Sequence, residues 1–173
     1  MGAVRRTIRC AACALVLLLA QQASTTPPHA LAASLLESKL LWATVDVCNA
    51  PADPGVVGIR ASMPGTGDAA ERMYMRFRLQ YRGTGGVWRY VGASGDSGFI
   101  YVGDALFVSR QAGSNFQLAT SSNGASTLRG LVIFEWRLDG RTIHHAQLTT
   151  TAKHSVTQGS VPRGYSASRC TIG

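Results

Sequence analysis

Charge is scarce in this sequence, and lysine is the scarcest charged residue. Asp, Glu, Lys and Arg make up 15% of the 173 residues, against about 25% in an average soluble domain. The only lysines are Lys39 and Lys153, and the remaining fixed positive charges are arginines. No segment forms the dense basic stripe that nucleic-acid binding requires, so we expect no nucleic-acid partner.

Long apolar runs are also lacking. The longest run extends from Cys10 to Ala20, about half of the ~20 residues that cross a bilayer, so we expect no permanent membrane anchor. Three arginines precede this run and Ala30-Leu31-Ala32 follows it, an order typical of a signal peptide. We predict a signal helix over residues 1–32, with cleavage after Ala32 or, alternatively, after Ala23.

The prediction of a signal peptide makes residues 33–173 a secreted domain. A retained anchor is the alternative interpretation of the apolar run. Arg5-Arg6 is followed by Thr7 and Ile8, a partial match to a twin-arginine signal, so general and twin-arginine export both stay open.

Cysteine is sparse as well, and Cys48 and Cys170 lie too far apart in the sequence to form a C-x-x-C redox motif. Outside the predicted signal peptide only Cys48 and Cys170 remain. Two cysteines in an exported chain most simply form one disulfide, and two free thiols are the alternative. The bridge would close a loop of about 120 residues, for which chain entropy sets an upper figure of roughly 4–5 kcal/mol.

Metal-ligating patterns are missing. His144 and His145 are adjacent, so on a strand they point to opposite faces and cannot easily share one ion. His154 has no acidic cluster beside it. The acidic residues of the first third are scattered and form no calcium loop: Asp46, Asp53, Asp68 and Glu71. We expect neither a metal nor a cofactor.

A catalytic constellation is equally hard to find. Gly95-Asp96-Ser97-Gly98 is similar to the nucleophile segment of trypsin-like serine proteases, whose histidine and aspartate come earlier in the chain. Here the only earlier histidine is His29, inside the predicted signal peptide. A serine nucleophile needs an activating base. The alternative to a non-enzymatic protein is a small secreted hydrolase using Ser97 with a later histidine, and the simpler interpretation is a polar turn.

Alternating apolar residues are what the sequence does contain. From Met73 to Arg82 the odd positions are apolar or aromatic, which predicts a strand with one buried face. Leu128 to Leu138 repeats this pattern, and both of its rows are apolar in the middle, which predicts a central strand. Asp139-Gly140 then predicts a tight hairpin into Thr142–Thr151.

Shorter segments complete the set of predicted strands. They are 40–48, 56–63, 87–91, 99–102, 105–109, 115–119 and an edge segment at 165–172. Gly103-Asp104 is expected to form a two-residue turn, and Ala112 to Ser114 another. Only Ala33 to Leu41 has a helical pattern, as a short helix, a fraying tail or the start of the first strand.

These features predict an all-β fold, an antiparallel sandwich of about seven to nine strands. A two-sheet domain with a buried tryptophan candidate and one disulfide resembles immunoglobulin-like domains in architecture. Cys48-Asn49-Ala50-Pro51 and the segment from Pro162 to Cys170 are similar to segments of small exported proteins of high-GC Gram-positive bacteria that have no assigned function. This second resemblance implies no function and no site. The disulfide departs from the usual pattern, because it would join the first strand to the C-terminal segment.

One candidate binding face remains. The even positions of Met73–Arg82 carry arginines, and aromatic residues accompany them there and on the following strand. The predicted face comprises Tyr74, Arg76, Arg78, Arg82, Trp88, Arg89 and Tyr90. Guanidinium groups bind phosphate and carboxylate through paired hydrogen bonds. The alternative is a solvated face that keeps the sheet soluble, with Glu135 pairing to Arg76 or Arg78 across the sheet.

The sequence therefore predicts a secreted, non-enzymatic binding or interaction module at the cell envelope or outside the cell. Its partner is expected to be an anionic cell-wall polymer, a carbohydrate or another envelope protein.

Overall fold

The fold consists of two antiparallel β-sheets packed face to face. The computed structural model describes residues 33–119, 124–154 and 158–173, so the predicted signal peptide lies outside the described residues. No helix within these ranges is long and apolar enough to span a membrane. The all-β class predicted from the sequence is confirmed, with nine strands in the described part of the chain.

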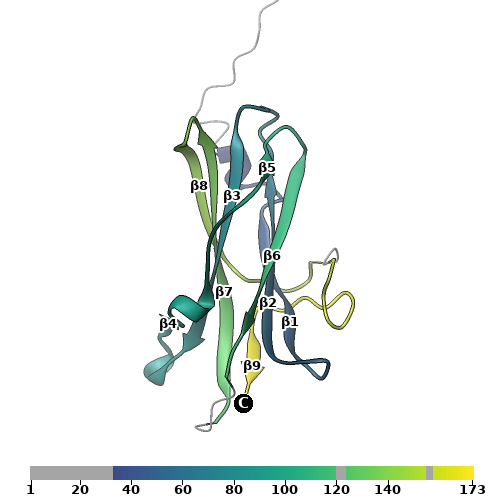
Figure 1. Cartoon of the computed structure of the whole chain (residues 1–173), viewed down its shortest axis with the longest axis vertical. Coiled ribbons are helices and arrows are strands. Elements are labelled where there is room, and N and C mark those ends of the chain that lie inside the picture. Colours follow the sequence, from purple (N-terminus) through teal and green to yellow (C-terminus); the bar gives the residue numbers. More distant parts are fainter. Residues whose placement is uncertain (1–32, 120–123, 155–157) are drawn as a thin grey trace, which may run out of the picture.

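The first sheet has three strands in the order β1-β2-β6. They are β1 (Trp42–Ala50), β2 (Asp53–Pro64) and β6 (Ser109–Gln117). The second sheet has six strands, with β3 and β7 at its centre. They are β3 (Arg72–Arg82), β4 (Trp88–Tyr90), β5 (Asp96–Asp104), β7 (Ser126–Leu138), β8 (Arg141–Thr149) and β9 (Cys170–Ile172). The strands run along the long axis of the molecule (Figure 1).

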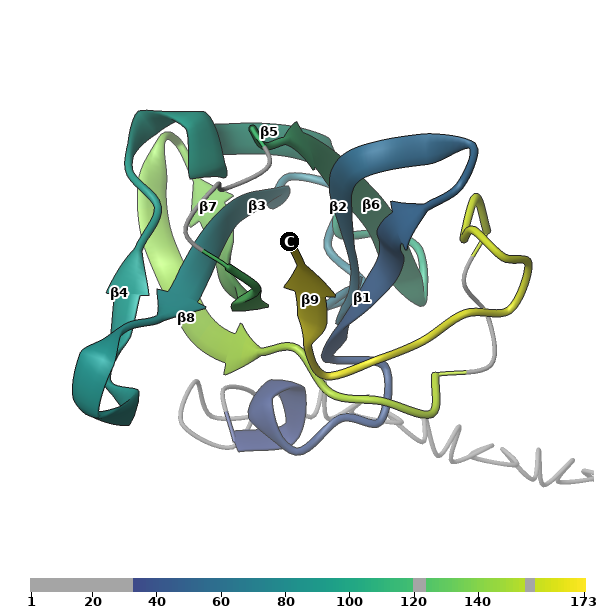
Figure 2. The same ribbon diagram turned by 90° about the horizontal axis from the view of Figure 1, so that it is seen from below.

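Each edge of the second sheet is formed by two strands, one of nine residues and one of three. β4 and β5 pair with different parts of β3, whereas β8 and β9 pair with different parts of β7. The chain passes from β5 to β6, and so from the second sheet to the first. In the end-on view β9 lies beside β1, away from the crossing between β5 and β6 (Figure 2).

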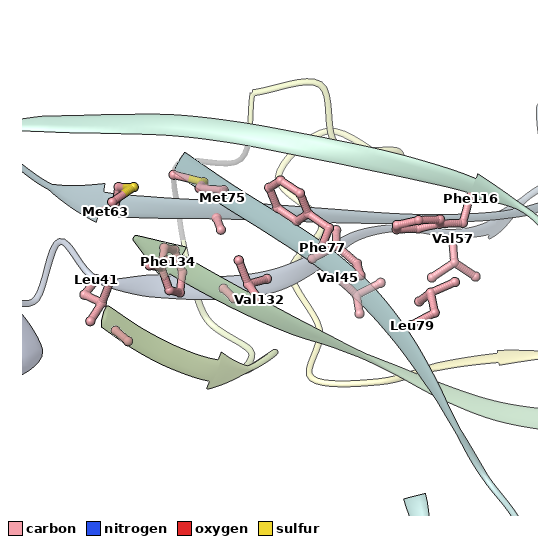
Figure 3. Close-up of a cluster of buried hydrophobic side chains, with 14 of the residues drawn as sticks. Leu41, Val45, Val57, Met63, Met75, Phe77, Leu79, Phe116, Val132 and Phe134 are labelled. Carbon is pink, nitrogen blue, oxygen red and sulfur yellow. The ribbon is translucent and has the colours of Figure 1, made fainter. Parts of the chain in front are cut away.

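Side-chain alternation accounts for the core. Met73, Met75, Phe77 and Leu79 of β3 are fully buried, as are three alternate residues of β7: Val132, Phe134 and Trp136. The first sheet contributes the apolar rows of β1 and β2 to the same cluster, and Figure 3 shows Phe77 and Leu79 gathered with Val45, Val57 and Phe116. Burial of each large apolar side chain stabilises the fold by roughly 1.5–3 kcal/mol.

Trp136 shows how the core accommodates a polar atom. Its indole Nε1–H donates a hydrogen bond of 2.9 Å to the carbonyl oxygen of Pro64 at the end of β2. This bond spans the two sheets and satisfies a donor that would otherwise be buried without a partner.

The predicted disulfide between Cys48 and Cys170 is confirmed. It joins β1 of the first sheet to β9 of the second. The segment before β9 also covers the free edge of β1, where the backbone of Ala167 exchanges two hydrogen bonds with Val45 and Val161 N–H donates to Asp46. The C-terminal segment therefore closes one side of the sandwich.

Two predicted turns are wrong. Gly103-Asp104 belongs to β5, and the chain reverses at residues 105–108 instead. Arg110 holds the strand end in place by donating to the Asp104 carbonyl and carboxylate, and Ala105 is buried. The segment from Ala112 to Ser114 lies inside β6, because β2 offers it a continuous ladder of partners that overrides its weak strand propensity.

The hairpin at Asp139-Gly140 is confirmed. Both residues have positive φ angles, 49° and 77°, as a two-residue turn of this type requires. β7 is a central strand, and Leu131 on its outward row is buried while Ile133 is half-buried. The helix expected from Ala33 is reduced to one turn at 33–36, and the last edge segment is reduced to β9.

The disulfide is expected to contribute strongly to stability. Replacing Cys48 and Cys170 together by Ala should lower the free energy of unfolding by about 2–5 kcal/mol, because the unfolded chain loses a cross-link over a long loop. Urea denaturation with and without a reductant measures this loss. The reductant should destabilise the native protein and leave the variant unchanged, and equal midpoints for all four samples would contradict the prediction.

Candidate binding face

The outward side of the second sheet, here called the outer face, carries the arginines and aromatic residues. Opposed residues of antiparallel strands project to the same side, so the register defines this face directly. Tyr74 stands between Tyr101 and Glu135, and Arg76 stands between Phe99 and Ile133. The outer face therefore extends over β5, β3 and β7.

Six of the seven residues predicted from the sequence share the outer face. They are Tyr74, Arg76, Arg78, Arg82, Trp88 and Tyr90, because Gln80 is opposite Tyr90 and Arg82 is opposite Trp88. Arg89 is opposite Tyr81 on the alternate row, so it projects to the other side of β4. Arg89 is exposed and lies outside the group.

Asp96 holds two of these arginines. The Arg76 guanidinium donates two hydrogen bonds to the Asp96 carboxylate, 2.8 Å from Nε to Oδ1 and 2.6 Å from Nη2 to Oδ2. Arg78 Nε lies 3.1 Å from the same Oδ2 without an aligned hydrogen bond, so its attraction is electrostatic. Hydrogen bonding and the positive charges lower the pKa of Asp96 against the effect of burial.

Glu135 pairs with a neighbour on its own strand. Arg137 donates to Glu135 Oε2 at 2.7 Å, and Thr142 donates at 3.1 Å. The expected pairing of Glu135 with Arg76 or Arg78 is wrong, because the register places Tyr74 opposite the carboxylate. The Arg137 guanidinium lies over the Tyr74 ring at 4.2 Å, so this pair still joins β3 to β7.

Two arginines that form no ion pair among the described residues lie beside Trp88. The guanidinium carbons of Arg129 and Arg169 lie 4.2 Å and 5.6 Å from the centre of the Trp88 ring. Arg129 also donates to the side-chain oxygen of Gln80 at 2.9 Å. Neither arginine forms an ion pair within the part of the chain that the structure describes. We call Trp88, Arg129 and Arg169 the Trp88 cluster.

The two arginines of the Trp88 cluster influence each other. The pKa of the Arg129 guanidinium is lowered from its ordinary value, first by partial burial and then by the positive charge of Arg169. A pair of like charges held together in this way is stabilised by any anion that lies between them. The Trp88 cluster is thus a part of the outer face where two guanidinium groups share one ring and neither forms an ion pair among the described residues.

Exposed aromatic rings lie beside these charges. Tyr90 of β4 is 45% exposed, and Phe99 and Tyr101 of β5 are 37% and 48% exposed. Arg78 lies 3.6 Å from the centre of the Tyr90 ring. The outer face therefore presents flat apolar rings next to guanidinium groups.

Sequence reasoning missed Arg129, Arg169, Phe99 and Tyr101. Arg129 occupies the same outward row of β7 as Glu135, so aligning the apolar rows of β3 and β7 would have identified it. No comparable signal marks Arg169, because its place beside Trp88 depends on how the C-terminal segment enters β9.

Ser97 has a structural role in β5. Its hydroxyl oxygen accepts a 2.9 Å hydrogen bond from Phe77 N–H and donates a 2.7 Å bond to the carbonyl of Gly98. The strand register shifts at this point, and the serine replaces the missing ladder bond. The contacts of Ser97 in the described residues include no histidine.

The histidines are also separated. His144 packs edge-on against Trp136, and His154 stacks on Trp42 near the other sheet, whereas His145 is opposite Glu135. Within residues 33–119, 124–154 and 158–173, no three His, Cys, Asp or Glu side chains are placed to hold a metal ion.

No family model matches the chain, and no curated protein matches it either. Function is therefore inferred from the geometry of the outer face.

The Asp96 carboxylate is expected to stabilise the fold in its ionised form. Asp96→Asn should lower the free energy of unfolding by about 1 kcal/mol at neutral pH, because Arg76 and Arg78 lose their counter-charge. Since the folded pKa of Asp96 is depressed, this contribution is present above its ordinary pKa of 3.8 and is lost as pH falls through the folded value.

Urea denaturation at a series of pH values measures the effect. Asp139→Asn is the matched control, because Asp139 is exposed in the β7–β8 turn and forms no ion pair among the described residues. A difference between native protein and Asp96→Asn that persists unchanged down to pH 2 would show that ionisation is not the cause.

Proposed function

We propose that this protein is a secreted, non-enzymatic binding module whose outer face binds an anionic polymer outside the cytoplasm. The main support is the Trp88 cluster, in which Arg129 and Arg169 share one aromatic ring and neither pairs with a carboxylate of the described residues. The ligand class is a polysaccharide that bears carboxylate or phosphate groups, as a cell-wall polymer does.

Charge distribution favours the Trp88 cluster over the rest of the outer face as the anion-binding part. Arg76, Arg78 and Arg137 are already paired with Asp96 or Glu135, so a ligand would have to compete with an intramolecular partner. Arg129 and Arg169 have no such partner in the described residues. Their guanidinium groups can donate paired hydrogen bonds to a carboxylate or phosphate.

The exposed aromatic rings of the outer face favour a polysaccharide as the polymer that bears the anionic groups. Tyr90, Phe99 and Tyr101 present rings along the edge formed by β4 and β5. The two tyrosines combine a flat ring with a polar hydroxyl, which suits contacts that are apolar on one side and wet on the other. An extended polymer can contact these rings while its charged groups reach Arg129 and Arg169.

Secretion is supported by the disulfide, because such bonds persist in oxidising compartments. The order of basic, apolar and small residues in segment 1–32 is the second support. Two antiparallel sheets linked by one disulfide also favour the immunoglobulin-like type within the sandwich class.

The Ser97 hydroxyl forms hydrogen bonds with the backbone of Phe77 and Gly98 rather than with an activating base. This favours a binding protein over a serine hydrolase.

The proposal predicts a specific loss of binding. The double variant Arg129→Gln and Arg169→Gln should bind polygalacturonate or polyphosphate at least tenfold more weakly than the native protein, because two guanidinium contacts are removed. Surface-immobilised polymer and soluble protein at constant salt measure the affinity, and dextran serves as the uncharged polymer.

Arg89→Gln is the matched control, because it removes an exposed positive charge from the other side of β4. This variant should retain binding within about twofold, since it changes only the screened long-range field. The proposal fails if the native protein binds neither anionic polymer, or if the control weakens binding as much as the double variant.

A further inference from the structure

Both lysines of the chain line a single pocket on the side of the molecule away from the outer face. Lys39 precedes β1 and Lys153 follows β8, so they come from distant parts of the sequence. The pocket has a volume of about 290 Å³. Besides the lysines, its polar and aromatic lining includes Trp42, Ser62, Gln111 and His154.

The floor of this lysine pocket is built from the three strands of the first sheet. Trp42 of β1 is opposite Ser62 of β2, and Ser62 is opposite Gln111 of β6. Register partners project to the same side, here away from the core residues Ala43 and Ala61. A hydroxyl and an amide therefore lie side by side in the lining of the pocket that both lysines share.

The buried hydroxyl of Ser62 lacks a hydrogen-bond partner among the described residues. Its side chain is 0% exposed, and its Oγ has no hydrogen-bond partner in the part of the chain that the structure describes. A buried hydroxyl without a partner destabilises a fold and is uncommon unless water or a ligand satisfies it. Ser62 is among the residues that line the pocket, so a partner bound there would reach the hydroxyl once the side chains that cover it move aside.

The charge of the pocket is uncompensated. Neither Lys39 nor Lys153 forms an ion pair within residues 33–119, 124–154 and 158–173. No Asp or Glu is among the residues that line the pocket. Two positive charges thus converge on one concave surface, where the field that attracts an anion is focused.

The wall of the pocket is fixed by a stacked pair. The His154 ring lies on Trp42 with centroids 4.7 Å apart. Its Nε2 forms a 2.8 Å hydrogen bond with the Thr151 hydroxyl, and its backbone N–H donates to Ser166. Burial lowers the pKa of His154 from its ordinary value of 6.5, so this ring adds no positive charge to the pocket at neutral pH.

We propose that the lysine pocket binds a tetrahedral dianion, a phosphate or sulfate group, between Lys39 and Lys153 with Ser62 as a hydrogen-bond donor. Two ammonium groups balance a dianion, whereas a carboxylate would leave one of them uncompensated. Lysine binds phosphate as a point charge without the planar fork that favours carboxylates. This site is separate from the outer face and does not depend on the proposed function.

Nuclear magnetic resonance at pH 7.5 and constant ionic strength tests the site. The indole N–H resonances of the three tryptophans report on separate regions: Trp42 on the pocket, Trp88 on the outer face and Trp136 on the core. Inorganic phosphate and sulfate should shift the Trp42 signal at lower concentration than the Trp88 signal. Acetate should bind at least tenfold more weakly. A sugar phosphate that binds more tightly than inorganic phosphate identifies a phosphomonoester as the source, and equal binding identifies the free anion.

Substitutions separate binding from folding. Lys39→Gln and Lys153→Asn should each weaken phosphate binding at least fivefold, and Lys39→Arg should retain it. Asn suits position 153 because the backbone φ there is 73°. Ser62→Ala should weaken binding about threefold while the urea midpoint stays equal or rises, since an unsatisfied buried hydroxyl is removed. Arg89→Gln is the charge control and should leave phosphate binding unchanged.

Three results would overturn this assignment. The first is a phosphate titration that shifts Trp88 alone, which would place the anion on the outer face. The second is acetate binding equal to phosphate binding. The third is full affinity in Lys39→Gln and Lys153→Asn.

Discussion

The alternation of side chains along β3 and β7 determines both the core and the outer face of this protein. The inward rows place Phe77 and Trp136 in the core, and the same alternation sends the arginines of both strands to the opposite side. Moving either strand by one residue would exchange the two rows and bury the guanidinium groups. The stability of the core and the composition of the outer face therefore have one origin.

Charge pairing then divides the outer face into two parts. Asp96 and Glu135 hold the arginines near the middle of the sheet, where they fasten neighbouring strands. Arg129 and Arg169 lie beyond these carboxylates, and Trp88 is their common contact. None of the ion pairs in the described residues involves Arg129 or Arg169, so these two arginines form a localised positive surface near β9.

Much of the fold could be predicted from the sequence. The alternation of buried residues identified β3 and β7, and Asp139-Gly140 identified the turn that joins β7 to β8. The cysteine count identified the disulfide. The turn at Gly103-Asp104 was predicted wrongly, because local turn chemistry says nothing of the Arg110 side chain that extends β5. Strand propensity also failed at Ala112, where pairing with β2 decides the structure.

The candidate site was only partly accessible to sequence reasoning. The arginine row of β3 was evident, yet which arginines are neutralised depends on contacts such as Arg76 with Asp96, which lie on different strands. The convergence of Lys39 and Lys153 depends on the path of the chain after β8, and no local pattern encodes that path. Long-range juxtaposition, rather than composition, determines where positive charge remains free.

The proposed binding of an anionic polymer at the Trp88 cluster can be tested by titrating isotope-labelled protein with a short oligogalacturonate and following the tryptophan indole N–H resonances. We expect a saturable shift of the Trp88 signal while the buried Trp136 signal stays in place. A Trp88 resonance that does not move at millimolar oligosaccharide would show that no such binding occurs there.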